Sequence, residues 1–221
     1  MANAVEKVNG IAIASIEAIN GITDANLQAL NGLEFTGTLP DSHTLIATAT
    51  ASSSATLAFT SGIDSTYDAY EFRFTNMHPQ TMSSFQFQVN ATDGADFNDS
   101  LITSTHFRTY HRESGDETHG PAYNTGLDLA QQASYQPLSN SVDNGDDSGC
   151  SGILTLYAPA STTYVKHFTA MIQTIHYVDY SQNSFTAGYI NDTTAIDEIS
   201  FMFSSGNIDA GVIKMYGIAK A

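Results

Sequence analysis

Histidines form the first pattern in this sequence that could carry chemistry, because imidazole is both a common metal ligand and a proton carrier. The stretch HFRTYH places His106 and His111 five residues apart, and Glu117 and His119 follow shortly after. Side chains of a strand alternate between its two faces, so this odd spacing sends the two rings to opposite sides if the stretch is a strand. A shared metal ion would then need a bend in the chain. The spacing favours ordinary surface or core histidines over a metal site.

A second candidate is the acidic stretch DNGDDSG at residues 143–149, which gathers three carboxylates among glycines. Calcium binds several oxygen ligands in loops of this kind. The order of the carboxylates does not match an EF-hand, and Asp-Gly stretches also form ordinary turns. Calcium binding is therefore a hypothesis here, and a turn is the simpler interpretation.

Motifs for catalysis are missing from the sequence. It contains no nucleophile elbow, no glycine-rich phosphate loop and no zinc-ligand spacing. Ser, His and Asp are all abundant, so no triad can be selected. The adjacent carboxylates Asp197 and Glu198 are expected to be solvated at the start of a strand, and a lone Cys150 cannot form an intrachain disulfide. We expect a chain that is not an enzyme and that uses neither a cofactor nor a metal ion.

The charge balance restricts the partners of this chain. Its 221 residues include 7 basic and 23 acidic side chains, a formal net charge of −16. Nucleic acids and anionic membranes are bound through basic surfaces, so we expect neither as a partner. The sequence begins without a signal-peptide pattern, and no apolar stretch approaches the length of a membrane span. With 42% hydrophobic residues, the chain can bury a core.

From about residue 44, apolar and polar residues alternate, which is typical of strands with one buried face. Tyr70, Phe72 and Phe74 share one face of YEFRFTN, and FQFQVN repeats the pattern at residues 85–90. Similar runs occupy residues 45–50, 56–60, 152–157, 168–176, 185–190, 199–203 and 212–216. Short strands separated by turn residues predict an all-β fold, an antiparallel, jelly-roll-like β-sandwich over residues 39–221.

Residues 111–151 interrupt this pattern and are rich in Gly, Ser, Asp and Asn. Loops of this length are usually functional or disordered, and residues 127–133, LDLAQQA, are expected to form a short helix within it. Tyr110, Tyr123 and Tyr135 lie in or beside the loop, and aromatic rings among planar polar groups suit sugar rings. They are candidate receptor residues at the exposed end of the sandwich. Alternatively, the tyrosines pack the loop onto the sandwich, where it covers a sheet edge.

The N-terminal region contains a repeat of eleven residues. Cut at that interval, residues 3–35 read NAVEKVNGIAI, ASIEAINGITD and ANLQALNGLEF. Because glycine readily takes the left-handed conformation that ends a helix, we expect short helical turns stopped by Asn-Gly. One continuous helix in a right-handed coiled coil is the alternative, although each internal glycine would cost it about 1 kcal/mol. Residues 1–38 are thus predicted to be a short helical repeat arm.

This arm presents regularly spaced apolar side chains that it cannot bury alone, because short isolated helices are marginal in water. The nine residues are Val5, Val8, Ile11, Ile16, Ile19, Ile22, Leu27, Leu30 and Leu33. They predict contacts with sister subunits or with a larger body; packing on the chain's own sandwich is the alternative. Closed symmetric assemblies are the usual solution, and we favour a homotrimer.

Both ends of the chain resemble one group of proteins. The unit [VIL]xx[VIL]NG[IL] resembles the INGV-type repeats near the N-termini of virion structural proteins from marine tailed bacteriophages. The C-terminal stretch IDEISFMFSSGNIDAGVIKMYGIAKA resembles a closing motif of the same phage proteins, a strand, a Ser-Gly-Asn turn and a second strand ending in a Leu-Tyr-Gly-Ile-like sequence. Met215 replaces the usual Leu here. The two stretches cover about 60 of the 221 residues.

The resemblance implies a non-enzymatic structural component of the virion. Such a protein would be an oligomeric tail fibre, an appendage or a capsid decoration, anchored by its arm, with other virion proteins as partners. A carbohydrate-binding module for host attachment, with a host surface glycan as its ligand, is the alternative function. A polysaccharide depolymerase is a third, and it would need a pair of carboxylates in a groove.

Overall fold

The computed structural model describes residues 42–91, 96–97, 100–115 and 119–219, together with six two-residue strands before residue 42. The chain divides into two compact units, Met1–Ser42 and His43–Ala221. Every regular element of the described residues is a strand, so the predicted all-β class is confirmed for them. No helix in this part of the chain is long and apolar enough to span a membrane.

The N-terminal unit contains three small antiparallel hairpins rather than the predicted helical turns. Their strands are β1 (Lys7–Val8) with β2 (Ile11–Ala12), β3 (Ala18–Ile19) with β4 (Ile22–Thr23), and β5 (Ala29–Leu30) with β6 (Leu33–Glu34). In every hairpin, the two residues between the strands are Asn-Gly. This dipeptide is the strongest short sequence signal for a two-residue hairpin connection. The predicted helical arm is not seen, because Asn-Gly favours hairpins here rather than the ends of helical turns.

The repeat places its apolar residues in equivalent positions of the three hairpins. Val8 pairs with Ile11, Ile19 with Ile22, and Leu30 with Leu33. The other three predicted arm residues, Val5, Ile16 and Leu27, lie outside the described residues. Each hairpin therefore brings two of the predicted apolar residues side by side next to Asn-Gly.

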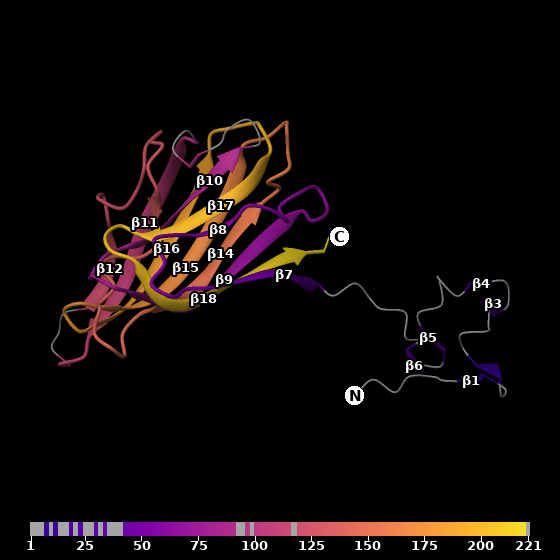
Figure 1. Ribbon diagram of the computed structural model, residues 1–221, viewed down its shortest axis with the longest axis horizontal. Coiled ribbons are helices and arrows are strands. Elements are labelled where there is room, and N and C mark those ends of the chain that lie inside the picture. Colours follow the sequence, from indigo (N-terminus) through magenta and orange to yellow (C-terminus); the bar gives the residue numbers. More distant parts are fainter. Residues whose placement is uncertain are drawn as a thin grey trace. The chain divides into compact units, whose positions relative to one another are not determined.

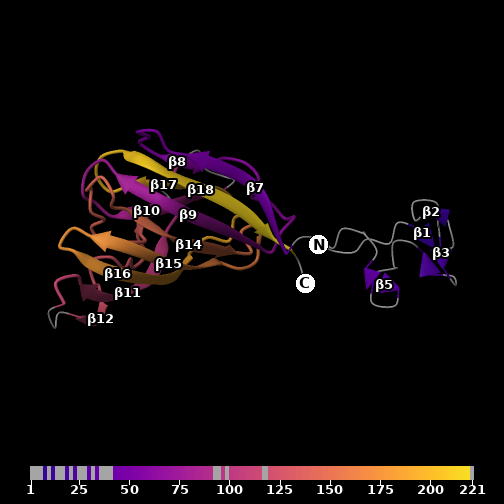
Figure 2. The same cartoon turned by 90° about the horizontal axis from the view of Figure 1, so that it is seen from below.

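The second unit contains two antiparallel sheets that face each other (Figures 1 and 2). In order, the large sheet contains β12 (His119–Tyr123), β11 (Ile102–Arg112), β16 (Tyr180–Ile190), β15 (Lys166–His176), β14 (Cys150–Tyr157), β9 (Ala69–Pro79), β18 (Ile208–Ile218) and β7 (His43–Thr50). The small sheet contains β13 (Gln136–Pro137), β10 (Phe85–Ala91), β17 (Ile196–Phe203) and β8 (Leu57–Phe59). All nine strands predicted from alternation are present, and β11, β12 and β13 are additional.

Aromatic side chains fill the space between the two sheets. Phe201 of β17 is fully buried, with its ring centroid 5.4 Å from that of Phe72 and 5.2 Å from that of Phe74. Phe85 of the small sheet stacks on Phe201 at 6.0 Å, with 13° between the ring planes. Tyr70 is buried with Phe72 and Phe74, which confirms that the predicted face of this strand lies in the core.

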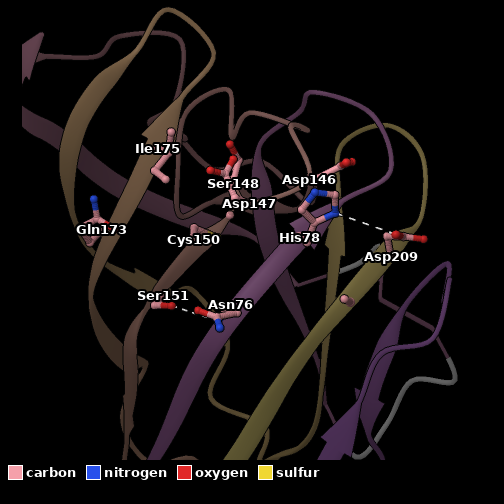
Figure 3. A pocket seen from close by; sticks show the side chains of 12 residues that line it. Asn76, His78, Asp146, Asp147, Ser148, Cys150, Ser151, Gln173, Ile175 and Asp209 are labelled. Carbon is pink, nitrogen blue, oxygen red and sulfur yellow. Dashed lines mark hydrogen bonds and ion pairs between the residues drawn. The ribbon is translucent and has the colours of Figure 1, made fainter. Parts of the chain in front are cut away.

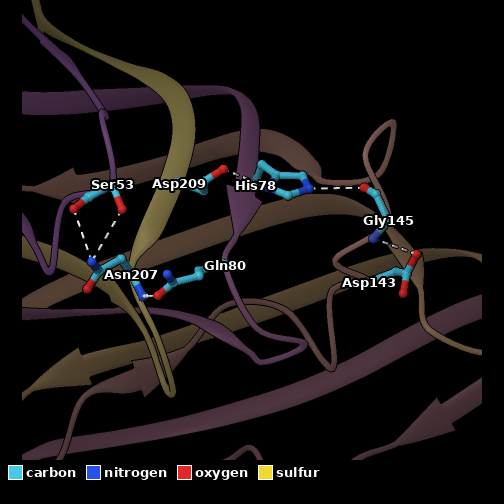
Figure 4. Close-up of polar contacts among 7 residues, drawn as sticks. All are labelled: Ser53, His78, Gln80, Asp143, Gly145, Asn207 and Asp209. Carbon is cyan, nitrogen blue, oxygen red and sulfur yellow. Dashed lines mark hydrogen bonds and ion pairs between the residues drawn. The ribbon is translucent and has the colours of Figure 1, made fainter.

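The closing motif of the sequence forms a corner between the two sheets. The chain leaves β17 in the small sheet and enters β18 in the large sheet through residues 204–207, where Gly206 has a φ of 71°. The side chain of Asn207 donates to the carbonyl of Ser53 at 3.1 Å, and its backbone NH donates to Gln80 Oε1 at 3.3 Å (Figure 4). Gly206 permits the turn, and Asn207 ties two other connections to it.

The segment at residues 111–151 covers sheet edges. Its strand β12 pairs with β11 at one edge of the large sheet, and β13 pairs with β10 at an edge of the small sheet. Val142 forms bridges both to Ser83 and to His176, and so joins the two sheets. The helix predicted at residues 127–133 is wrong: this stretch is a turn and a bridge between Gln132 and Ile102. Pairing with the sheets satisfies its backbone groups instead of a helix.

Gly152 of β14 allows two central strands of the large sheet to approach closely. A Cβ at this position would lie 2.2 Å from the carbonyl oxygen of Met171 and 2.8 Å from Cα of Ile172, both backbone atoms of β15. We expect Gly152→Ala to lower the free energy of unfolding by about 1–3 kcal/mol, the usual cost of overpacking, in urea denaturation. Gly126→Ala is the control, because no atom lies within 4 Å of its Cβ position. Equal losses at both positions would contradict this prediction.

Candidate functional site

The inner face of the large sheet changes from apolar to polar toward β11. On β15, Phe168 and Ile172 are buried in the core. Farther along the sheet, the cross-strand pairs become Arg108 with Ser184, Tyr110 with Gln182, and Arg112 with Tyr180. Together with their neighbours on β15, they form what we call the polar cluster: Arg108, Tyr110, Arg112, Thr174, His176, Tyr180 and Gln182. Side-chain alternation places all of them on the same face.

Aromatic rings and guanidinium groups pack together in the polar cluster. Arg108 donates from Nη1 to Gln182 Oε1 at 2.6 Å, and its guanidinium lies 4.9 Å from the centre of the Tyr110 ring. The ring of Tyr180 lies between two others, 5.4 Å from Tyr110 and 5.5 Å from His176. Such cation–π and ring contacts are worth about 0.5–1.5 kcal/mol each, and they hold the rings in fixed positions.

A cavity of about 320 Å³ lies beside this cluster, lined by residues 123–127 and Asn140. Asn140 connects the cavity to the cluster, since its Nδ2 donates to His176 Nε2 at 3.4 Å. The cavity wall is held from behind by the buried Gln136, whose Nε2 donates to the carbonyl of Leu127 at 2.9 Å.

Six buried side-chain atoms around this cavity and cluster have no hydrogen-bond partner within the protein. They are His106 Nε2, Arg108 Nε, Asn124 Nδ2, Gln136 Oε1, Thr174 Oγ1 and His176 Nδ1. Arg108 Nε and Asn124 Nδ2 are donors, Gln136 Oε1 is an acceptor, and the hydroxyl and imidazole atoms can act in either way. A buried polar atom left unsatisfied costs about 1–3 kcal/mol. Buried polar atoms of both kinds, donors and acceptors, are the usual partners of an enclosed water molecule.

Two imidazoles near this site are neutral at pH 7. Burial lowers the pKa of His176 to about 4, and the positive charge of Arg108 acts in the same direction. Burial likewise lowers the pKa of His106 to about 4, although the Pro137 carbonyl opposes the shift. His106 lies on the same face of β11 as Arg108 and Tyr110, and its Nδ1 lies 3.0 Å from Thr186 Oγ1. Both rings therefore act here as neutral hydrogen-bonding groups.

The three predicted receptor tyrosines do not form one surface. Tyr110 belongs to the polar cluster, but Tyr123 is the cross-strand partner of Phe107, on the opposite face of the sheet. Tyr123 is exposed and donates its hydroxyl hydrogen to Asp128 Oδ2 at 2.7 Å. Tyr135 is half-buried in the covering segment. No sequence pattern indicated Tyr180, because its cross-strand neighbour Arg112 is far away in the chain.

The histidines of HFRTYH lie on opposite faces of β11, as their spacing predicts. His106 is buried, whereas His111 is exposed and faces His119 of β12, with 6.0 Å between the ring centroids. Glu117 lies outside the described residues. Within the described ranges, no three His, Cys, Asp or Glu side chains are grouped so as to hold a metal ion.

The acidic stretch at residues 143–149 borders a second cavity, of about 560 Å³, which is also lined by His78 and Asp209 (Figure 3). His78 donates from Nε2 to the carbonyl of Gly145 at 3.0 Å, and its Nδ1 lies 4.0 Å from Asp209 Oδ2 (Figure 4). Asp143 Oδ2 accepts from the Ser148 hydroxyl at 2.8 Å and from the Gly145 NH, which lowers the pKa of Asp143. The loop thus uses Asp143 for its own turn.

Two groups that could have been reactive are bonded or buried. Cys150 is buried, and burial raises the pKa of its thiol, so it is not a thiolate nucleophile. Asp197 and Glu198 are half-buried rather than solvated as expected, and burial raises the pKa of Asp197. Glu198 accepts from Asn90 Nδ2 at 3.0 Å. Asp197 is the extra residue at a register shift of β17, because Asn90 pairs with Glu198 and Ala91 with Ile196.

Comparison with known proteins finds nothing similar: no family model matches the sequence, and no curated protein or solved structure matches the chain. The residues themselves must therefore carry any functional argument.

Acid should destabilise the fold through His106 and His176. Their pKa values fall from 6.5 to about 4 on folding. The unfolded chain therefore binds these protons first, and stability that is complete above pH 6.5 is lost as the pH falls toward 4. Each group contributes a slope of up to about 1.4 kcal/mol per pH unit. We expect His106→Gln to flatten the dependence of unfolding free energy on pH, measured with urea between pH 7 and 4.

The control for this measurement is His111→Gln, which replaces an exposed ring of the same strand. The carboxylates common to all three proteins contribute equally to each slope, so the comparison isolates the buried ring. Identical slopes for His106→Gln and the unsubstituted protein would contradict the prediction.

Proposed function

We propose that this chain is a non-enzymatic structural component of a phage particle. It would be an oligomeric fibre, an appendage or a capsid decoration in the virion, anchored by its N-terminal arm. The observation that carries the proposal is the arm: three successive hairpins bring the same pair of apolar positions together beside Asn-Gly, ahead of a separate sandwich. The resemblance of both chain ends to phage virion proteins supports the same assignment.

The physics of short hairpins supports an anchoring role for the arm. A two-stranded hairpin is at best marginally stable alone in water, and these hairpins have only two paired residues in each strand. Their apolar side chains gain stability only against another surface. Units that recur every eleven residues suit a partner surface that also repeats, such as identical subunits in a closed ring. We favour a homotrimer that also contacts other virion proteins.

The closing motif also has a structural explanation, which supports a scaffold function. Gly206 and Asn207 are used to turn the chain between sheets and to bind Ser53 and Gln80 of the same chain. These contacts stabilise the sandwich itself. A fold motif of this kind suits a protein whose task is assembly.

The arm can be tested by adding charge at its apolar positions. We expect the double variant Ile19→Asp, Leu30→Asp to be lost from purified phage particles, whereas the unsubstituted chain co-purifies with them in mass spectrometry. Two buried unpaired carboxylates would cost several kcal/mol of binding, on the order of a hundredfold or more in occupancy. Gln28→Glu is the control, because the repeat already has Glu6 and Glu17 at the equivalent positions.

Normal incorporation of the double variant would show that the arm is not the anchor. Absence of the unsubstituted chain from purified particles would contradict the proposed function itself.

A second candidate function is glycan binding by the polar cluster. The observation that favours it is the pair of half-buried rings of Tyr110 and Tyr180, which lie 5.4 Å apart with the guanidinium groups of Arg108 and Arg112 packed on them, because sugars offer flat faces and hydroxyl groups. Tyr180 is the sharpest probe, because its ring contacts both Tyr110 and His176.

We expect Tyr180→Leu to weaken binding to host surface glycans on an array about tenfold, the effect of losing a ring contact of about 1.4 kcal/mol. Tyr189→Leu is the control, because it removes a half-buried ring from the opposite face of the same strand. Circular dichroism melting of both variants checks that the sandwich is folded. Equal array signals for Tyr180→Leu and Tyr189→Leu would contradict glycan binding at this site. Release of reducing ends from host polysaccharide would indicate a depolymerase instead.

A further inference from the structure

A row of apolar side chains crosses the outer face of the large sheet. Phe107 of β11, Phe185 of β16, Met171 of β15 and Ile153 of β14 are successive cross-strand neighbours. Phe107 and Phe185 stack with 4.9 Å between ring centroids and 12° between ring planes. The exposed fractions of Phe107 and Met171 are 45% and 48%, so this row is not part of the core.

The same four strands carry no charged side chain on their outer face. Their outward positions are the alternate residues of 103–111, 181–189, 167–175 and 151–157, and none of these is Asp, Glu, Lys or Arg. The next strand, β9, carries charged side chains again: Arg73 and Glu71 form an ion pair there. In a chain of net charge −16, an uncharged face of this extent is a local exception.

We infer that this face is an interface at which a second copy of the same chain packs its own outer face. The charge distribution selects this partner. Elsewhere, two copies of so acidic a chain repel each other, whereas these four strands present apolar, hydroxyl, amide and imidazole side chains and no carboxylate. Exposed apolar patches on such sheets typically mark sites of association.

The size of the face fits a stable interface. Strands lie about 4.8 Å apart and rise about 3.3 Å per residue, so four strands of up to eleven residues cover roughly 700 Å². A standard interface buries about 800 Å² on each partner. The flat sheet alone thus supplies most of the area, before side chains and flanking loops add to it.

Packing of one face on its own copy is a two-fold contact, in which each residue meets the same surface on its partner. Met171 lies on β15, the fourth strand from the β12 edge of the sheet and well inside the face. This inference rests on the proposed role as a homo-oligomer and adds a sandwich interface that is separate from the arm.

Met171→Glu tests this interface in the full-length chain, because it places a charge of similar length at the middle of the row. We expect its molar mass, measured by light scattering at micromolar concentration, to be half that of the unsubstituted protein. Thr48→Glu is the matched control, since Thr48 is exposed at the opposite end of the same register row, beside Lys214, which itself pairs with Arg73. Circular dichroism melting of each variant confirms that the sandwich is folded.

Each outcome decides for or against the face. A halved mass for Met171→Glu, with an unchanged mass for Thr48→Glu, supports it. A monomeric unsubstituted protein, or an unchanged mass for Met171→Glu, overturns it. The arm variant Ile19→Asp, Leu30→Asp separates the two proposals. If that variant alone fails to enter particles and the mass of Met171→Glu is unchanged, the sheet-face interface is overturned and the arm remains the anchor.

Discussion

The packing of Phe201 between the two sheets is the contact on which the rest of the sandwich depends. Its ring lies within 5.2–6.0 Å of Phe72, Phe74 and Phe85, and so joins both sheets at one point. The small sheet has four strands, against eight in the large one. Its last aromatic contact toward β11 is Phe87 with Phe168 of β15, at 5.1 Å. Beyond that contact, the inner face of the large sheet needs a different cover.

That cover is the segment between β12 and β14, and its chemistry explains the polar cluster. A short polar segment cannot bury a wide apolar surface, so the inner faces of β11 and β16 carry Arg108, Tyr110 and Gln182 instead of aliphatic residues. The strict alternation of a strand then leaves the other face of β11 to Phe107 and its threonine neighbours. One strand therefore supplies a polar inner surface and an apolar outer one.

Sequence patterns predicted those elements in which alternation between apolar and polar residues was strong. Phe72 and Phe74 sit in such a strand and lie in the core as predicted. The strand β11 was missed because its inner residues, such as Ser104 and Arg108, are as polar as its outer ones. Tyr110 was recognised from the residues around it in the sequence. Its neighbour Gln182 was not, because the pairing of β11 with β16 sets their contact and no local sequence pattern shows that pairing. Asn-Gly was misread because glycine both ends helices and joins hairpin strands.

The acidity of the chain gives these surfaces their selectivity. Association gains from apolar contact only where the approach of like charges does not oppose it. The paired apolar residues of the three hairpins and the uncharged face around Met171 belong to different units of the chain. The two proposed contacts therefore use different residues. Two interfaces of different symmetry on one subunit can extend an assembly beyond a single closed ring.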